Sequence, residues 1–251
     1  MVKRISKTYI GDIFCEFIVQ DKITDTIILL PGFPSSNKMD SEMKFLYKRG
    51  YNVFFPRFKG SFQSKGFFLE DNPVEELRVF VNKLKKEKII NLWDMSKVSF
   101  KIDHLILFGQ SFSGAIACGL VAKVKDFRKL VLFSPVWDFE KHNLLGNEQD
   151  LNHLVPFVKR AYQNLYRIKF DNFIKEISKF EEIHDYFYAK KIKIPLLVLN
   201  DFSDKIVSIE HSRNMKENLK NLKILEHNLG HGFNLKVLEN CFGKIEKYLK
   251  N

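Results

Sequence analysis

Residues 104–114 read His-Leu-Ile-Leu-Phe-Gly-Gln-Ser-Phe-Ser-Gly. The four consecutive apolar residues at 105–108 predict a strand that is buried on both faces of a sheet. Small residues follow, and they open a predicted helix over 115–123. Ser111 is therefore expected on a tight turn between a strand and a helix, where its hydroxyl is exposed and its small neighbours let both elements pack closely.

The rest of the chain repeats this alternation of strands and helices. Gly11 and Asp12 predict a hairpin turn between strands at 8–10 and 13–20. Further strands are expected at 26–30, 51–55, 129–133, 196–199 and 223–226, and further helices at 41–49, 74–87, 209–219 and 235–249. Residues 88–103 fit no single pattern. The alternation predicts an α/β fold, with a mostly parallel central sheet, helices on both faces and an antiparallel edge.

Residues 137–191 interrupt this alternation, because they show helical periodicity and many aromatic residues but no buried strand. We interpret this block as an inserted helical cap, and residues 1–136 and 192–251 as the core domain. Most cap aromatics are expected to form the core of the cap itself, and some are expected to face Ser111. These aromatics are Phe157, Tyr162, Tyr166, Phe170, Phe173, Tyr186, Phe187 and Tyr188.

Composition limits the class of protein. The chain has 251 residues, of which 45% are hydrophobic, so it can bury a sizeable core. No apolar run approaches the roughly 18 residues of a membrane-spanning helix, and polar residues interrupt any N-terminal signal peptide. We therefore expect a cytoplasmic protein without a membrane span. The three cysteines are far apart and lack metal-ligand spacing, so neither a disulfide framework nor a bound metal is predicted.

The formal charge of +11 raises the question of a nucleic-acid partner. The lysines are scattered, however, and no nucleic-acid recognition motif accompanies them. No nucleic-acid partner is therefore predicted, and the charge is read as a consequence of a lysine-rich composition. The number of subunits in solution is left open.

The turn around Ser111 resembles the nucleophile elbow of the α/β-hydrolase family, whose pattern is Gly-x-Ser-x-Gly. Gly109 and Ser111 match this pattern, whereas Ser113 replaces the second glycine and Gly114 follows it. The resemblance implies the α/β-hydrolase fold with a Ser-His-Asp triad, whose members follow one another in the order serine, acid, histidine.

A serine hydroxyl is a poor nucleophile at neutral pH, so it needs a base to take its proton and an acid to orient that base. His231 is the candidate base, because Gly230 and Gly232 let the backbone bring the imidazole into a crowded site. His227 is an alternative. By resemblance, the acid follows the strand at 196–199, where Asp204 fits the family pattern and Asp201 remains the rival.

Two further loops resemble family loops. Pro31-Gly32-Phe33 follows the strand at 26–30, as the oxyanion loop does, with Pro31 in the place of a histidine. The resemblance assigns the oxyanion hole to the backbone N–H groups of Phe33 and Phe112. Residues 56–64 resemble an Asp-x-x-Gly-x-Gly loop in which Arg57 replaces the aspartate. We expect this second loop to be architectural and to form one wall of the pocket.

These motifs together predict a serine hydrolase that cleaves a small carboxylic ester through an acyl-enzyme on Ser111, His231 and Asp204. No metal or other cofactor is implied. A peptidase or acyltransferase would use the same three residues, so both remain alternatives. A catalytically silent binding protein on the same fold is the alternative from another class, because a fold does not determine a function.

Overall fold

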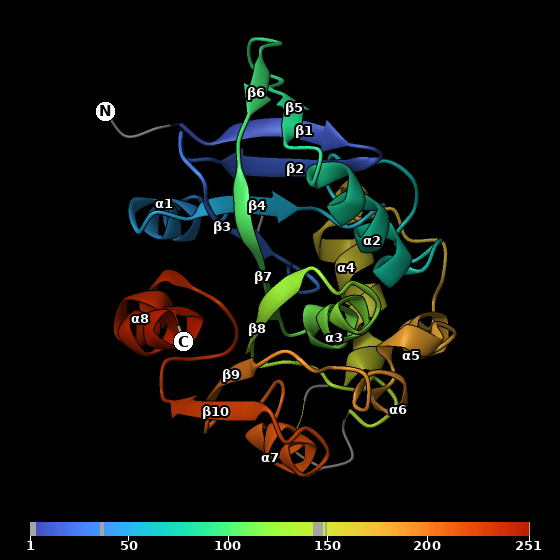
Figure 1. Ribbon diagram of the computed structural model, residues 1–251. Coiled ribbons are helices and arrows are strands. Elements are labelled where there is room, and N and C mark those ends of the chain that lie inside the picture. The colour runs from blue at the N-terminus through green and yellow to red at the C-terminus, as the bar shows by residue number, and fades with distance from the viewer. Residues whose placement is uncertain (1–3, 36–37, 143–147, 149, 251) are drawn as a thin grey trace.

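The computed structural model describes residues 4–35, 38–142, 148 and 150–250. Its centre is an eight-stranded sheet in the order β1-β2-β4-β3-β7-β8-β9-β10, and strands β4 to β10 of this order run parallel (Figure 1). The strands are β1 (Ser6–Ile10), β2 (Ile13–Ile18), β3 (Thr24–Leu29), β4 (Asn52–Pro56), β7 (Ile102–Gln110), β8 (Phe127–Phe133), β9 (Leu196–Asp201) and β10 (Leu222–His227). The predicted α/β class is confirmed, and so is the antiparallel hairpin β1–β2 at the sheet edge.

Helices cover both faces of the sheet, as the alternation predicted. Helices α1 (Asp40–Lys48) and α8 (Leu235–Lys250) pack on one face, and α2 (Pro73–Leu84) and α3 (Ser113–Lys123) pack on the other (Figure 1). Helix α7 (Ile209–Asn218) lies against β9 and β10. The central strands β7 and β8 contribute apolar side chains to both layers, which explains why they read as continuous apolar runs.

Residues 88–103 contain a small hairpin that the sequence did not predict. Strands β5 (Lys88–Ile90) and β6 (Lys97–Ser99) pair antiparallel and are separate from the main sheet. Each strand has three residues, and Ile89 is the only buried residue of the two strands. Strands this short and exposed do not show enough alternation of apolar and polar residues to be predicted from the sequence.

Between the core strands β8 and β9, the described residues form short helices. They are the 3₁₀ turns η1 (Leu151–His153), η2 (Gln163–Leu165) and η3 (Glu181–Ile183) and the helices α4 (Leu154–Ala161), α5 (Phe173–Ile177) and α6 (Asp185–Tyr188). They lie on the same side of the sheet as α2 and α3 (Figure 1). Within the described residues, no helix has the length and apolar character needed to cross a membrane.

The loop after β4 is bound to this helical block through the backbone. Tyr166 pairs with Ser61 in an isolated antiparallel bridge, and the N–H of Arg167 donates to the carbonyl of Gly60 at 2.8 Å. The Arg167 guanidinium also donates to the carbonyls of Phe62, Ser64 and Gly66. Residues about 100 positions apart in sequence are thereby held together on one side of the block.

Small residues allow the close approach of β7, α3 and their neighbours. A Cβ added at Gly114 would lie 2.5 Å from Cβ of Pro135 and 2.7 Å from the carbonyl oxygen of Val136. A Cβ added at Gly119 would lie 2.4 Å from the carbonyl oxygen of Glu182 in η3. The packing of α3 against the loop after β8 and against the helical block therefore depends on glycine at these two positions.

We expect Gly114→Ala to destabilise the fold, although alanine favours a helix over glycine. The added methyl group must displace backbone atoms, which typically costs about 1–3 kcal/mol of unfolding free energy. Gly243→Ala in α8 is the matched control, because a Cβ there meets no atom within 4 Å, so helix propensity alone should stabilise it by about 0.5–1 kcal/mol. Urea unfolding of both variants measures this difference. Equal effects at the two positions would show that the contact at Gly114 is unimportant.

Candidate active site

Ser111 lies on the turn between β7 and α3 in a left-handed backbone conformation, with φ of 48°. This conformation is costly for a residue other than glycine. Its backbone is held on both sides, because its N–H donates to the carbonyl of Phe133 at 2.9 Å and its carbonyl accepts from Gly114 and Val136 at 2.9 and 3.0 Å. These bonds fix the Ser111 side chain at the wall of a pocket.

Ser113 stands where the family pattern has glycine, and its side chain is fully buried. Its Oγ accepts a hydrogen bond from the N–H of Gln110 at 2.8 Å. The same hydroxyl lies 3.0 Å from the carbonyl oxygen of Gln110 and 3.2 Å from that of Leu30, to either of which it can donate. Ser113 therefore connects the turn at Ser111 to the end of β3 instead of disturbing it.

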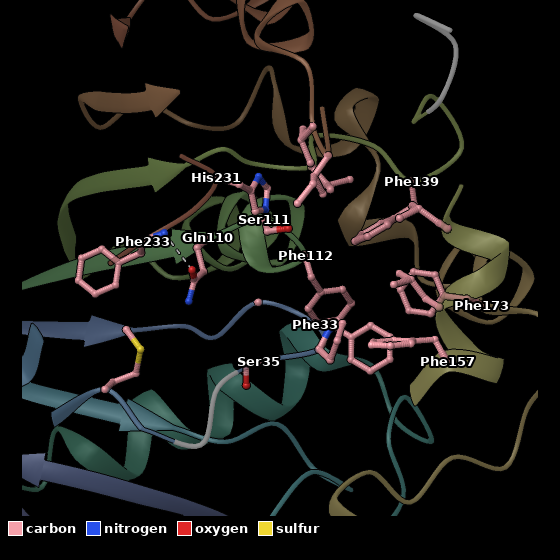
Figure 2. Close-up of a pocket in the computed structure, with 18 of the residues that line it drawn as sticks. Phe33, Ser35, Gln110, Ser111, Phe112, Phe139, Phe157, Phe173, His231 and Phe233 are labelled. Carbon is pink, nitrogen blue, oxygen red and sulfur yellow. Dashed lines mark hydrogen bonds between the residues drawn. The ribbon is translucent and has the colours of Figure 1, made fainter. Parts of the chain in front are cut away.

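The imidazole of His231 lies beside Ser111, and both residues line the same pocket (Figure 2). On its other side, Nδ1 of His231 is 2.7 Å from Oδ2 of Asp204. The Asp204 side chain is 0% exposed and that of His231 is 22% exposed. The fold thus brings together three side chains that lie 27 and more residues apart in sequence.

Asp204 keeps a low pKa although it is buried. Burial raises the pKa of its carboxyl, but the hydrogen bond and charge of His231, the Ser134 hydroxyl and the N–H of Ile206 outweigh burial, so that the pKa falls below its ordinary value. Asp204 is therefore ionised and can only accept hydrogen bonds. The proton between the two residues then belongs to Nδ1 of His231, which leaves Nε2 as the basic nitrogen.

Asp201, the rival acid, has a different environment. One of its oxygens accepts from the N–H of Gly230 at 2.6 Å, and the other accepts from the N–H and the hydroxyl of Ser203 at 2.7 Å. It binds the backbone that leads to His231 but not the imidazole. His227, the alternative base, has its Nδ1 3.9 Å from Asp201 and is not among the pocket residues.

Two residues that the motifs did not identify hold the histidine loop in place. Oε1 of Gln110 accepts from the N–H of Phe233 at 3.0 Å (Figure 2), and Oγ of Ser134 accepts from the N–H of Gly232 at 3.3 Å. Gly232 itself has φ of 75°, and a Cβ there would lie 3.1 Å from Oε1 of Gln110. The turn at Ser111 and the loop at His231 are thus joined directly.

The predicted oxyanion donors come from two different loops. Phe33 and Phe112 both line the pocket next to Ser111 (Figure 2). In the part of the chain that the structure describes, neither backbone N–H donates to another protein group. Buried amides usually have a partner, so these two remain available to a ligand in the pocket.

The pocket has a volume of about 310 Å³ and is mainly apolar. Five phenylalanines gather on the side away from His231, and they are Phe33, Phe112, Phe139, Phe157 and Phe173 (Figure 2). Among the cap aromatics considered above, Phe157 and Phe173 line the pocket. By contrast, the Tyr188 side chain is buried with its hydroxyl on the carbonyl of Trp137, and Tyr186 is exposed.

The prediction that the loop at 56–64 forms a wall of this pocket was wrong, since none of its residues lines it. Arg57 is buried and makes an ion pair with Glu16 at 2.8 Å. Its guanidinium also lies over the rings of Phe55 and Phe62, at 4.0 and 4.7 Å from their centroids. A buried guanidinium needs such partners, and these contacts are consistent with the expected architectural role of the loop.

Comparisons with known proteins match the fold but no sequence family. No family model and no curated protein matches the sequence. An esterase of Pyrococcus furiosus, Pf2001, superposes with a TM-score of 0.67 at 21% identity, covering 98% of this chain and 89% of that one. An α/β-hydrolase from a lagoon-sediment metagenome, MGS-MChE2, gives 0.62 at 14% identity, covering 97% and 95%.

A third similar structure is an acylaminoacyl peptidase in complex with a chloromethyl ketone, at a TM-score of 0.66 and 15% identity. The match covers 99% of this chain but 41% of the peptidase. Identities this low establish architecture and not activity. Together with the sheet order and the strand-turn-helix at Ser111, the superpositions show that the chain has the α/β-hydrolase fold.

Proposed function

We propose that this protein is a serine hydrolase that cleaves carboxylic esters. The observation that carries the proposal is the 2.7 Å contact between Nδ1 of His231 and Asp204, on an imidazole that lies beside Ser111 in one pocket. An ionised acid, a histidine with a free basic nitrogen and a serine on a sharp turn are the groups that nucleophilic acyl transfer requires.

In the proposed reaction, Nε2 of His231 takes the hydroxyl proton as Oγ of Ser111 attacks the acyl carbon of the ester. The tetrahedral oxyanion accepts hydrogen bonds from the N–H groups of Phe33 and Phe112. When the intermediate collapses, the C–O bond to the alcohol breaks and His231 returns the proton to the leaving alkoxide. Water, deprotonated by His231, then hydrolyses the acyl-enzyme. Asp204 stabilises the imidazolium that forms in each step.

The pocket favours an ester with an apolar group over a peptide. Its polar side chains are largely occupied, because Ser35 Oγ lies 3.3 Å from the Tyr166 hydroxyl and the Gln110 oxygen accepts from Phe233. Few groups therefore remain to bind a peptide backbone, whereas the phenylalanine side of the pocket suits an apolar acyl or alcohol group. Est1E of Butyrivibrio proteoclasticus, which has the same fold, was crystallised with ferulic acid, itself an aromatic acid.

A fluorophosphonate probe tests the nucleophile directly. We expect the native protein to be labelled at one residue, mapped by peptide mass spectrometry to Ser111, and heat-denatured protein to remain unlabelled. Ser111→Ala should abolish labelling, whereas Ser35→Ala, which changes the other serine of the pocket, should retain it. Undiminished labelling of Ser111→Ala would refute the proposal. Hydrolysis of an anilide more readily than the matching ester would favour a peptidase instead.

A further inference from the structure

A second cluster of reactive side chains lies outside the pocket, where the segment after β8 meets α7. Nε2 of His211 is 2.7 Å from Oε2 of Glu148, and Nδ1 of His142 is 4.0 Å from the same oxygen. One nitrogen of each histidine and a carboxylate oxygen lie within 4.8 Å of one another. The side chains of His142, Glu148 and His211 are 2%, 1% and 15% exposed, so the cluster is largely enclosed.

The ligand atoms of this cluster are of the kinds that bind a divalent transition metal. Two imidazole nitrogens and one carboxylate oxygen are a common ligand set for zinc, with a fourth position for water. Bonds of about 2.0–2.1 Å in a tetrahedron place neighbouring ligand atoms about 3.3 Å apart. The distances of 2.7 and 4.0 Å lie on either side of this value, so side-chain shifts of under about 1 Å would complete the geometry.

The carboxylate of Glu148 is already placed as a metal ligand would need. Its Oε1 accepts from the N–H of Ser208 at 2.6 Å, and this bond orients the carboxylate as outer contacts orient metal ligands. Burial raises the pKa of Glu148, but the bonds from His211 and Ser208 outweigh burial and lower the pKa below its ordinary value. A buried carboxylate needs partners for its charge, and a divalent cation would be one such partner.

A cavity borders the cluster at His211. It has a volume of about 270 Å³ and is lined by Trp137, Asp138, Asp185 and Met215 among others. Two other groups of acidic residues and histidine are Asp25/Asp103/His104 and Asp138/Glu140/His184. Each of them offers a single histidine and includes an exposed acidic residue, so neither matches the enclosed cluster.

We propose that His142, Glu148 and His211 bind a divalent transition metal of the zinc class, with water as the fourth ligand. The ion joins His142 and Glu148 to His211 in α7. It also stiffens the loop that carries Asp204, because Val207 donates to Asp204 at 3.1 Å while the adjacent Ser208 donates to Glu148. The proposed role of the ion is to stabilise this part of the fold, and the site does not depend on the proposed hydrolase activity.

Zinc titration of the chelator-stripped full chain tests the site. We expect one equivalent of Zn²⁺ to bind by calorimetry, one equivalent of Co²⁺ to give visible absorption bands, and Zn²⁺ at about 100 times Kd to raise Tm by about 5–10 °C. Glu148→Gln and His211→Ala should each weaken binding by about 100-fold or more, since a lost ligand costs at least what a lost outer contact does. Glu148→Gln retains an acceptor for Ser208, which protects the fold.

His153→Ala is the matched control, because this histidine lies in the same segment with 84% of its side chain exposed. It should bind zinc as the native protein does. Zinc affinity that is unchanged in both Glu148→Gln and His211→Ala would overturn the proposal. Loss of the bound equivalent in His104→Ala would also overturn it, because the ion would then lie at Asp25/Asp103/His104. Absence of binding at 100 µM zinc would overturn it as well, because a three-ligand site of this kind is expected to be filled at that concentration.

Discussion

Ser111→Ala should lower kcat for p-nitrophenyl acetate by about 10⁵–10⁶-fold, which is the loss seen when a triad nucleophile is removed from serine hydrolases generally. The reason is that Ser111 is the proposed nucleophile beside His231, whereas the hydroxyl of Ser35, which also lines the pocket, lies 3.3 Å from the Tyr166 hydroxyl. A residual rate above that in water should remain, because the amides of Phe33 and Phe112 would still stabilise the oxyanion. Steady-state kinetics with a highly purified variant measures the loss.

A control for the backbone is needed, since Ser111 has φ of 48° and alanine at such an angle costs about 1–2 kcal/mol. Ser111→Gly removes the same hydroxyl but tolerates this angle. Both variants should be equally inactive, and the glycine variant should be the more stable of the two in urea. Activity that returns in Ser111→Gly would mean that strain, and not the loss of a nucleophile, inactivated the alanine variant.

Asp204→Asn should lower kcat by about 10⁴-fold with little change in KM. Asparagine would present either an amide N–H to His231 or an oxygen without charge, and both alternatives weaken the stabilisation of the imidazolium and the choice of tautomer. The fall in kcat and an unchanged KM would show that the interaction matters in the transition state more than in substrate binding. Kinetics over a full substrate range separates the two parameters.

Asp201→Asn is the matched variant, because it makes the same chemical change three residues earlier, at the end of β9. It should keep kcat within about tenfold of the native value, but lose about 1–3 kcal/mol of unfolding free energy, since an amide cannot accept from both Gly230 and Ser203. Kinetics and urea unfolding distinguish the two aspartates. The opposite result, with Asp201→Asn inactive and Asp204→Asn active, would assign the acid to Asp201.

The fold was predictable where a strand is buried on both faces. Strands β7 and β8 contribute to the two hydrophobic layers, so they leave uninterrupted apolar runs in the sequence. The turn at Ser111 was visible for a related reason, because close packing requires glycine at Gly114. The β5–β6 hairpin was missed, since each of its strands has three residues and is mostly exposed.

The residues of the candidate site that lie in local sequence motifs were predictable. Ser111 and His231 each lie in a stretch rich in small residues that can be read locally. The choice between Asp201 and Asp204 depends on which carboxylate faces the imidazole, and this is a property of the folded loop. Gln110 and Ser134 could not be identified from the sequence, because their partners are backbone N–H groups 123 and 98 residues away.

The absence of metal-ligand spacing led to the prediction that no metal is bound. This reasoning does not cover ligands from separate elements, as the proposed ligands His142 and His211 would be. Spacing rules detect ligands on one helix or one turn, whereas a site between two segments has no characteristic interval. The zinc titration therefore also tests that sequence prediction.

The hydroxyl of Ser113 has a consequence for the energetics of catalysis. A single buried group spans the start of α3 and the carbonyl of Leu30, three residues before Phe33. The contact of Ser113 therefore links the turn of the proposed nucleophile to the loop of the proposed oxyanion amide of Phe33 before any substrate arrives. In a preorganised site of this kind, the dipoles need not reorient as charge builds up on the acyl oxygen, so little of the activation barrier is spent on reorganising the protein.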